Sequence, residues 1–291
     1  MKELKKRFVI FGASNAKYGD FLINNWLKSL KKNIDLSKID IVILDYGLTI
    51  NQRKNLELEK VIIFKCEENG HIANIRYRDM LRYLQKTKYE QVMSCDSGDI
   101  IIQNEITHLF TENKYDFRAT VEDLPTSLTE YILMGKTFSR EMSKLIEETL
   151  RGKKVINGGV IIAPRDKFIN LCETMCNLIR KMNLFGPDQV VLNYYLYQNK
   201  FHRLDKGYNY IIGSVDETFY VKNGIFYDKN NKIIPIVHNA GRYNYLRPIK
   251  NFGYGKNFNR LSYFSYYQLR FFCNLTKLFK ILKNIEKFII K

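Results

Sequence analysis

Short apolar runs alternate with segments of helical periodicity at the start of the chain. The apolar runs span residues 8–13, 39–44, 61–64 and 91–95, and the helical segments span residues 18–30 and 72–84. Parallel strands need a long crossover, which is usually a helix, so this order predicts an α/β fold built on a parallel sheet. Ligands of such sheets bind at the carboxyl ends of the strands. We therefore expect the chemistry in the loops that follow the apolar runs.

The same alternation continues, less regularly, beyond the fourth apolar run. Further strands are expected at residues 117–121, 159–163 and 233–237, and further helices at residues 137–150, 166–181 and 187–197. Neither an internal repeat nor a low-complexity linker interrupts this part of the chain, and the composition changes only near residue 250. We expect one α/β catalytic domain over residues 1–250 and a tail over residues 251–291.

The charge balance narrows the class of partner. The chain carries 47 Lys and Arg against 30 Asp and Glu, a formal net charge of +17. This surplus favours a polyanionic partner such as a nucleic acid, an anionic lipid or a phosphorylated substrate. The sequence lacks an RRM, KH or zinc-finger signature, so we expect no nucleic acid partner. Hydrophobic residues make up 45% of the chain, which excludes a mainly disordered protein.

The cysteines and the first residues of the chain indicate the cellular compartment of the protein. The five cysteines are an odd number without a Cys-x-x-Cys pair, so neither a disulfide framework nor a zinc ribbon is predicted. Cys172 and Cys176 are spaced for a metal on one helix, but without a nearby His we interpret them as buried free thiols. The charged start and the lack of a run of about 20 apolar residues predict neither an export signal nor a transmembrane helix. We expect a cytoplasmic protein.

The most informative segment is an acidic turn between two apolar runs. Asp96-Ser97-Gly98-Asp99 follows the strand that ends at Cys95 and precedes three consecutive isoleucines. Mg²⁺ and Mn²⁺ prefer carboxylate oxygens and often bind substrate phosphates as well. The pair is thus a candidate for bridging a metal to a diphosphate. An ordinary surface turn rich in Asp and Gly is the alternative interpretation.

This segment resembles the Asp-x-Asp motif of nucleotide-sugar glycosyltransferases of the GT-A fold, especially glycosyltransferase family 8. In that family the motif follows a sheet strand and holds Mn²⁺ on the donor diphosphate. Asp96 matches the first aspartate of the motif, and Asp99 or a shifted backbone must supply the second. The resemblance implies a Rossmann-like mixed sheet flanked by helices and a site for Mn²⁺ or Mg²⁺.

Three more motifs follow in the order of that family. Residues 156–162 resemble its Asn-x-Gly-Val strand, in which Asn157 would help to hold the sugars. Residues 186–193 resemble its Asp-Gln motif, which would bring Asp188 and Gln189 to the donor sugar. Residues 237–241 resemble its His-x-x-Gly motif, in which His238 would be a metal ligand together with Asp96 and Asp99. Taken alone, Asn157 could belong to a simple turn and Asp188 to the first turn of a helix.

Contacts to the nucleotide are expected in the first loops. Residues that follow the first two strands, and one arginine of the helix before the acidic turn, are candidates: Gly12, Ala13, Ser14, Asn15, Asp45 and Arg78. Arg76 and Arg82 share that helix, and we expect one of the three arginines to face the phosphates and the others to face solvent. Glu122 and Asp123 follow a later strand and could bind a sugar hydroxyl.

The tail has the pattern of a basic amphipathic helix. Residues 256–291 contain eight Lys or Arg, one Glu and nine Phe or Tyr. One face of the expected helix is apolar and the other is basic. The two faces carry Leu275, Leu278, Phe279, Leu282, Ile285 and Ile289, and Lys277, Lys280, Lys283, Lys287 and Lys291. This pattern favours an anionic membrane surface, although packing on the domain core is the alternative.

These observations lead to one main hypothesis and two alternatives. The main hypothesis is a metal-dependent, retaining hexosyltransferase that uses a nucleotide sugar, a UDP-sugar, and a lipid-linked or cell-surface glycan acceptor. It would work in lipopolysaccharide or capsule synthesis on the inner face of the membrane, to which the tail attaches it. Asp188, Gln189 and Asn157 are the expected catalytic residues. An inactive membrane scaffold, favoured by the altered acidic spacing, and a nucleic-acid binder are the alternatives.

Overall fold

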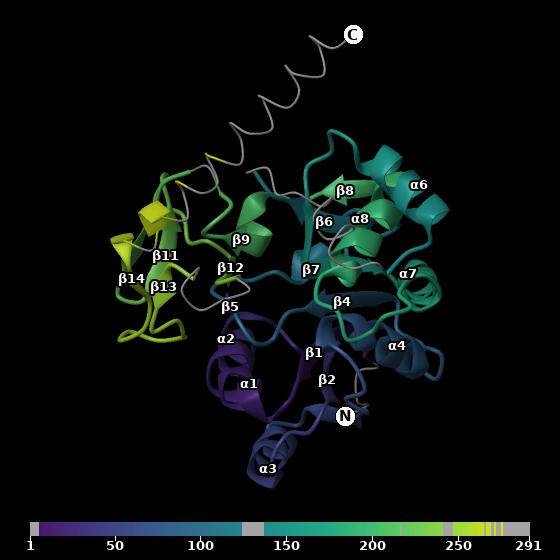
Figure 1. Cartoon of the computed structure of the whole chain (residues 1–291). Helices are drawn as coiled ribbons and strands as arrows, with labels where there is room; N and C mark the ends of the chain where they lie inside the picture. The colour runs from purple at the N-terminus through teal and green to yellow at the C-terminus, as the bar shows by residue number, and fades with distance from the viewer. Residues whose placement is uncertain are drawn as a thin grey trace.

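The computed structural model describes residues 6–123, 137–215, 217–240, 247–264, 266–268, 271 and 275. A seven-stranded sheet in the order β3-β2-β1-β4-β7-β6-β8 forms its centre (Figure 1). Strands β3, β2, β1 and β4 run parallel, whereas β7 is antiparallel to both of its neighbours. The strands are β1 (Phe8–Ser14), β2 (Ile39–Asp45), β3 (Ile62–Lys65), β4 (Gln91–Cys95), β6 (Phe117–Val121), β7 (Ile156–Pro164) and β8 (Phe201–Arg203).

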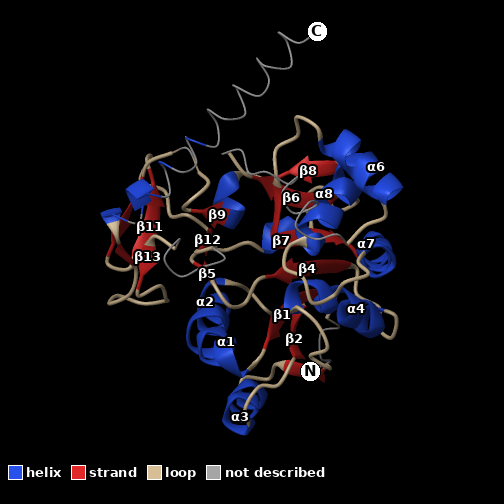
Figure 2. Cartoon of the chain, viewed as in Figure 1, coloured by secondary structure: helices blue, strands red, loops and turns tan. Residues whose placement is uncertain are grey.

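Helices cover both faces of this sheet (Figure 2). One face carries α1 (Ala16–Phe21), the π-helical η1 (Leu22–Leu27), α2 (Lys28–Asn33) and α3 (Ile50–Leu58). The other carries α4 (Ile72–Leu84), α7 (Arg165–Leu178) and α8 (Pro187–Asn199), and α6 (Arg140–Leu150) packs against α8. Side chains alternate across a strand, so Phe8 and Ile10 pack with Trp26, whereas Val9 and Phe11 join the opposite core.

Smaller strands build a second layer beside the large sheet. β5 (Ile100–Ile102), β12 (Ile236–His238) and β9 (Tyr210–Ile211) form a three-stranded sheet, and η3 (Lys206–Asn209) leads into β9. A hairpin of β10 (Phe219–Lys222) and β11 (Ile225–Asp228) and the pair β13 (Ile249–Lys250) and β14 (Arg260–Leu261) lie next to it (Figure 1). The 3₁₀ helix η2 (Thr107–Phe110) follows β5 and packs its apolar side chains into the first core.

The predicted α/β fold is confirmed, and so is the mixed sheet that the family resemblance implied. The five expected strands that end near residues 13, 44, 64, 95 and 121 are β1, β2, β3, β4 and β6. The wholly parallel sheet expected from the apolar runs alone is not formed, because β7 inserts between β4 and β6 and runs against both. Apolar runs do not carry strand direction, so the sequence pattern could not show this reversal.

Several predictions concern other parts of the chain. Cys172 is buried, and it and Cys176 are both free thiols. The expected boundary at residue 250 falls within the paired strands β13 and β14. The amphipathic stretch over residues 276–291 lies outside the described residues. Among the residues that are described, helices long and apolar enough to cross a membrane are absent.

Candidate active site

The acidic pair lies in the turn between β4 and β5. Asp96 directly follows β4, and Asp99 directly precedes β5. The backbone N–H of Asp96 donates to the carbonyl of Gly159 at 2.8 Å, and the backbone N–H of Asn239 donates to the carbonyl of Asp99 at 2.9 Å. Backbone hydrogen bonds to distant segments therefore hold both ends of the turn.

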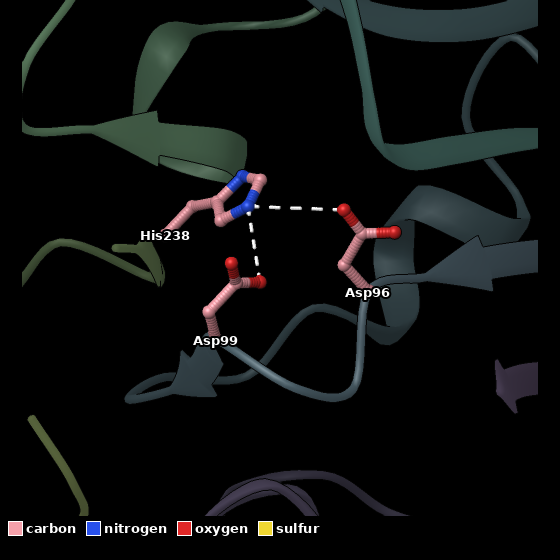
Figure 3. A group of neighbouring side chains, drawn as sticks. All are labelled: Asp96, Asp99 and His238. Atoms are coloured by element: carbon pink, nitrogen blue, oxygen red, sulfur yellow. Dashed lines mark ion pairs between the residues drawn. The ribbon is translucent and has the colours of Figure 1, made fainter. Parts of the chain in front are cut away.

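The small sheet brings His238 to this turn. β12 pairs with β5 so that His238 lies opposite Ile100, the residue after Asp99. Its Nε2 atom lies 3.2 Å from Asp99 Oδ1 and 3.8 Å from Asp96 Oδ2 (Figure 3). One possible ligand atom from each of the three residues lies within 4.8 Å of the other two. Two carboxylates and an imidazole are suitable ligands for Mn²⁺, so the residues present fit a divalent metal.

Two arginines flank the acidic pair. Arg76 of α4 forms an ion pair with Asp96, and its Nη2 atom lies 3.8 Å from Asp188 Oδ2. Arg247 donates from Nη2 to Asp99 Oδ2 at 2.8 Å. Arg76 is buried, and its Nε atom is buried without a hydrogen-bond partner. Two positive side chains thus balance the two carboxylates of the turn.

The neighbours shift the pKa values of these groups in opposite directions. Burial lowers the pKa of His238, but the charge of Asp99 and its hydrogen bond raise it above the ordinary value overall. Burial raises the pKa of Asp99, but His238 and Arg247 bring it below the ordinary value. Burial also raises the pKa of Asp188, and the charge of Arg76 only partly offsets this effect. The Asp99–His238 contact is therefore an ion pair when the histidine is protonated.

Asn157 lies on the β7 side of the same cluster. Its Oδ1 atom accepts from the backbone N–H of Gly159 at 2.8 Å, and its Nδ2 atom donates to Glu122 Oε1 at 2.9 Å. A Cβ atom on Gly159 would lie 2.5 Å from Cε1 of His238. Only glycine leaves room for the imidazole against β7, which explains the Gly at this position.

Asp188 and Gln189 start helix α8. Gly186 has a positive φ of 105° and Pro187 occupies the first helical turn, so this pair sets where the helix begins. The Asp188 carboxylate is directed at Arg76, which links it to Asp96. The Gln189 amide accepts from the N–H of Gly158 at 3.1 Å and donates to a carbonyl of β7. Asp188 and Gln189 therefore lie on the rim of the acidic cluster, and the amide of Gln189 is already hydrogen-bonded within the protein.

The first loop contacts the acidic turn through Ser97. The Ser97 hydroxyl accepts from the N–H of Ala13 at 3.2 Å and donates to the carbonyl of Ala13 at 2.9 Å. A Cβ atom on Gly12 would lie 3.1 Å from the Cβ atom of Ser97, so a glycine permits this approach. Ser14 is buried, and Asn15 donates to Glu68 at 3.1 Å. The expected nucleotide loop and the acidic turn are thus neighbours.

Two expected ligand residues lie outside the cluster. Arg78 donates to Asp79 and Asn69, whereas Arg76 is the arginine of this helix that contacts the acidic turn. Residues two apart on a helix point in different directions, and the sequence did not distinguish them. Asp45 is buried, and its carboxylate accepts from the backbone and from Arg53. Both Asp45 carboxylate oxygens therefore already accept hydrogen bonds within the protein.

Arg247 and Asn209 are the site residues that the motifs did not reveal. Arg247 lies nine residues beyond His238, and no motif marks it. Asn209 ends η3 and contacts both His238 and Asn157. The place of Arg247 shortly after His238 is too weak a signal to single it out, and Asn209 lies 29 residues before His238.

Comparisons with solved structures show which known proteins have a similar fold. No family model matches the chain, and no curated protein matches its sequence. A solved structure of an active-site mutant of LgtC is similar over 82% of this chain and 89% of that chain, with a TM-score of 0.55 and 14% identity. The glycosyltransferase GlyE of Streptococcus pneumoniae TIGR4 is similar over 87% of this chain, with a TM-score of 0.54 and 17% identity.

A third similar structure is the bifunctional glycosyltransferase WbbM, with a TM-score of 0.52 and 15% identity over 83% of this chain. This chain spans only 47% of the WbbM chain and 58% of the GlyE chain. A further LgtC structure, titled as a galactosyltransferase with donor and acceptor sugar analogs, has a TM-score of 0.50 and 14% identity. These likenesses confirm the expected GT-A glycosyltransferase fold.

Proposed function

We propose that this protein is a metal-dependent glycosyltransferase that moves a hexose from a UDP-sugar to a hydroxyl of a lipid-linked or cell-surface glycan, with retention of configuration. The observation that carries the proposal is the cluster of Asp96, Asp99 and His238 at the carboxyl end of β4. Its position agrees with the rule that ligands of α/β sheets bind at the carboxyl ends of the strands. Similarity to structures of glycosyltransferases supports the class of reaction.

Asp96, Asp99 and His238 would hold Mn²⁺, or Mg²⁺ in its place. When bound, the metal would neutralise negative charge on the departing diphosphate. Arg76 and Arg247 already balance the charges of Asp96 and Asp99, so a divalent cation would leave the site positive. A positive site favours the diphosphate of a nucleotide sugar, and fixed charges of this kind usually supply the largest part of catalysis.

The other residues of the rim would orient the sugar. Arg76 contacts both Asp96 and Asp188, and so couples the metal side of the site to the start of α8. Asp188 would accept hydrogen bonds from sugar hydroxyls, because its carboxylate has no other side-chain partner among the described contacts. Gln189 and Asn157 lie next to the same edge, and their roles toward the sugar follow only from the family resemblance.

A panel of nucleotide sugars tests the donor. Thermal unfolding midpoints are measured with each sugar, with and without Mn²⁺, because a ligand of the native state raises its stability. We expect a UDP-sugar to raise the midpoint only when Mn²⁺ is present. Stabilisation by the same sugar without metal would contradict the metal model.

Hydrolysis of a UDP-sugar without an acceptor separates an enzyme from an inactive scaffold. We expect slow, Mn²⁺-dependent release of UDP. The comparison variant is Asp96→Ala, which should lose this release; its circular dichroism spectrum checks that it is folded, because the substitution also removes the ion-pair partner of buried Arg76. Metal-dependent sugar binding without any release of UDP would favour the scaffold.

We also propose that the protein attaches to the inner face of an anionic membrane and acts there on its acceptor. Four aromatic side chains in one short stretch are strongly exposed: Tyr263, Phe264, Tyr267 and Phe271. Lys256 and Arg260 line a hollow of about 670 Å³ beside them, together with other aromatic residues. Aromatic and basic side chains together suit the interface of an anionic bilayer.

Cosedimentation with vesicles tests this attachment. We expect binding to vesicles that contain phosphatidylserine, and weaker binding to neutral vesicles. The double variant Phe264→Ser/Tyr267→Ser should reduce binding, whereas Tyr115→Ser, which removes an exposed aromatic ring elsewhere, should not. Equal binding of the double variant and the wild type would exclude this surface as the attachment site.

A further inference from the structure

His238 is held from both sides of its ring. Its Nε2 atom faces Asp96 and Asp99, whereas its Nδ1 atom lies 2.9 Å from Oδ1 of Asn209. Asn209 is 3% exposed, so water does not compete for this contact. What Asn209 presents to Nδ1 decides whether that nitrogen carries a proton, whereas the carboxylates face only Nε2.

The orientation of Asn209 follows from a chain of hydrogen bonds that starts at the backbone. The N–H of Gly159 can only donate, and it donates to Asn157 Oδ1 at 2.8 Å. The atom of Asn157 at this point must therefore be its oxygen. The same oxygen lies 3.0 Å from the Asn209 amide, so the Asn209 atom at that contact must be its nitrogen.

The other end of the Asn157 amide agrees with this assignment. Its nitrogen donates to Glu122 Oε1 at 2.9 Å. If Asn157 were reversed, its nitrogen would face the N–H of Gly159 and its oxygen would face a carboxylate. If Asn209 alone were reversed, two amide oxygens would face each other. The backbone therefore fixes both amides, and Asn209 presents its oxygen to His238.

We infer that Asn209 is a positioning residue that keeps a proton on Nδ1 of His238, so that Nε2, the nitrogen that faces Asp96 and Asp99, is the one that gives its lone pair to a metal. An oxygen accepts but does not donate, so Nδ1 must carry the proton for this contact to be a hydrogen bond. A metal ligand needs a free lone pair, and partners on the other ring nitrogen usually fix the tautomer of ligating histidines. The inference rests on the proposed function, because it gives the lone pair a metal to bind.

The backbone packing around His238 supports the same role. The missing Cβ atom of Gly159 leaves the ring in close contact with β7, because a Cβ atom there would lie 2.7 Å from Nδ1. The Asn157 oxygen that accepts from Gly159 is also the acceptor for Asn209. The same two residues therefore set the position of the ring and the identity of its hydrogen-bond partner.

The first test is a proton NMR spectrum of the metal-free protein with ¹⁵N-labelled histidine. The chain has four histidines, so His238→Gln identifies the resonance of His238. We expect a slowly exchanging Nδ1–H proton for His238 in the wild type and its loss in Asn209→Leu. A wild type in which Nδ1 of His238 carries no proton would overturn the inference, whether or not the protein binds a metal.

The second test measures Mn²⁺ binding by electron paramagnetic resonance, with Mn²⁺ alone as the probe. We expect Asn209→Leu to weaken binding about 10–100-fold, the usual effect of losing a partner of a metal ligand. Asn209→Asp keeps an oxygen toward Nδ1 but sets its second oxygen against Asn157 Oδ1, so it should recover only part of the lost affinity. Asn170→Leu, on the exposed face of α7, is the control and should bind like the wild type.

The outcomes separate the inference from the proposed function. Wild-type affinity in Asn209→Leu, or equally weak binding in the Leu and Asp variants, contradicts the positioning role. A wild type that binds no Mn²⁺ contradicts the proposed metal site, and the NMR test then decides the inference by itself. If Asn209→Leu does not fold, Asn209→Ala takes its place against Asn209→Asp.

Discussion

Asp45 and Asp96 occupy similar places at the carboxyl ends of two parallel strands, β2 and β4, but their surroundings differ. The Asp45 side chain is 1% exposed and accepts from the N–H groups of Gly47 and Leu48 and from Arg53. The Asp96 side chain is 31% exposed, and it faces His238 and the second carboxylate, Asp99. Asp96 also pairs with Arg76, but only through Oδ1, so an aspartate at a strand end is available for a ligand where folding leaves one of its oxygens without a hydrogen bond.

Substitution of Asp96 gives the largest expected effect on activity. Asp96→Asn removes one negative ligand and should lower glycosyl transfer by about 10²–10³-fold, the usual cost of losing a main electrostatic contact. The thermal midpoint should fall as well, because Asp96 is the ion-pair partner of the buried guanidinium of Arg76. Steady-state turnover of the UDP-sugar that stabilises the protein checks this prediction. Near-normal turnover would remove Asp96 from the metal site.

Substitution of Asp45 should affect stability instead of activity. Asp45→Asn places an amide nitrogen against Arg53 or the turn N–H groups, which should cost about 1–3 kcal/mol of the free energy of unfolding. Asp166→Asn is the control, because that side chain is 89% exposed. Urea denaturation measures both variants. A stable Asp45→Asn protein with lost activity would mean that the end of β2 binds the donor after all.

Alanine substitutions at two glycines near the acidic turn test whether the space around the His238 ring is needed for metal binding. Gly159→Ala places a Cβ atom 2.5 Å from the His238 ring and should weaken Mn²⁺ binding about 10-fold or more. Gly98→Ala lies within the turn itself, but its Cβ atom would meet only Tyr18 at an ordinary 3.4 Å. It should bind Mn²⁺ like the wild type. Equal affinities in the two variants would show that the His238 ring can move without loss of the site.

The smallest expected effect is the pH dependence of stability from Glu122. Burial raises the pKa of Glu122 above its ordinary value of 4.5, and the hydrogen bond from Asn157 only partly offsets this. Between pH 4.5 and the raised pKa, the unfolded chain loses the Glu122 proton while the folded protein still keeps it. The free energy of unfolding of the wild type therefore falls as the pH rises through this range. Glu122→Gln avoids this loss and should be more stable than the wild type at pH 8 but not at pH 4, by about 1 kcal/mol.

Denaturation curves at both pH values check the sign of this difference, and Glu148→Gln, an exposed residue of α6, is the control. A difference that is the same at pH 4 and pH 8 would contradict a buried, ionising Glu122. The result would also show whether the polar rim near Asn157 is held by charge or by hydrogen bonds alone.

The regular strands of the large sheet could be predicted because each is a continuous apolar run. β5, β9 and β14 are only two or three residues long, and they exist because another segment of the chain pairs with them. The pairing of β5 with β12, whose residues lie more than a hundred positions apart, leaves no local pattern. The same limit applies to the choice between Arg76 and Arg78, which depends on how α4 is rotated against β4.

The sequence alone determined the fold class and the identity of Asp96, Asp99 and His238 as candidate ligands, because strand ends and short motifs are local features. Tertiary structure decided how these candidates are used. In the folded protein the Asp45 carboxylate accepts hydrogen bonds from nearby donors, and Arg76 points toward the acidic turn. Asn209 lies between His238 and Asn157. The physical reason is that a polar side chain becomes available for a ligand only after folding has settled which partners reach it.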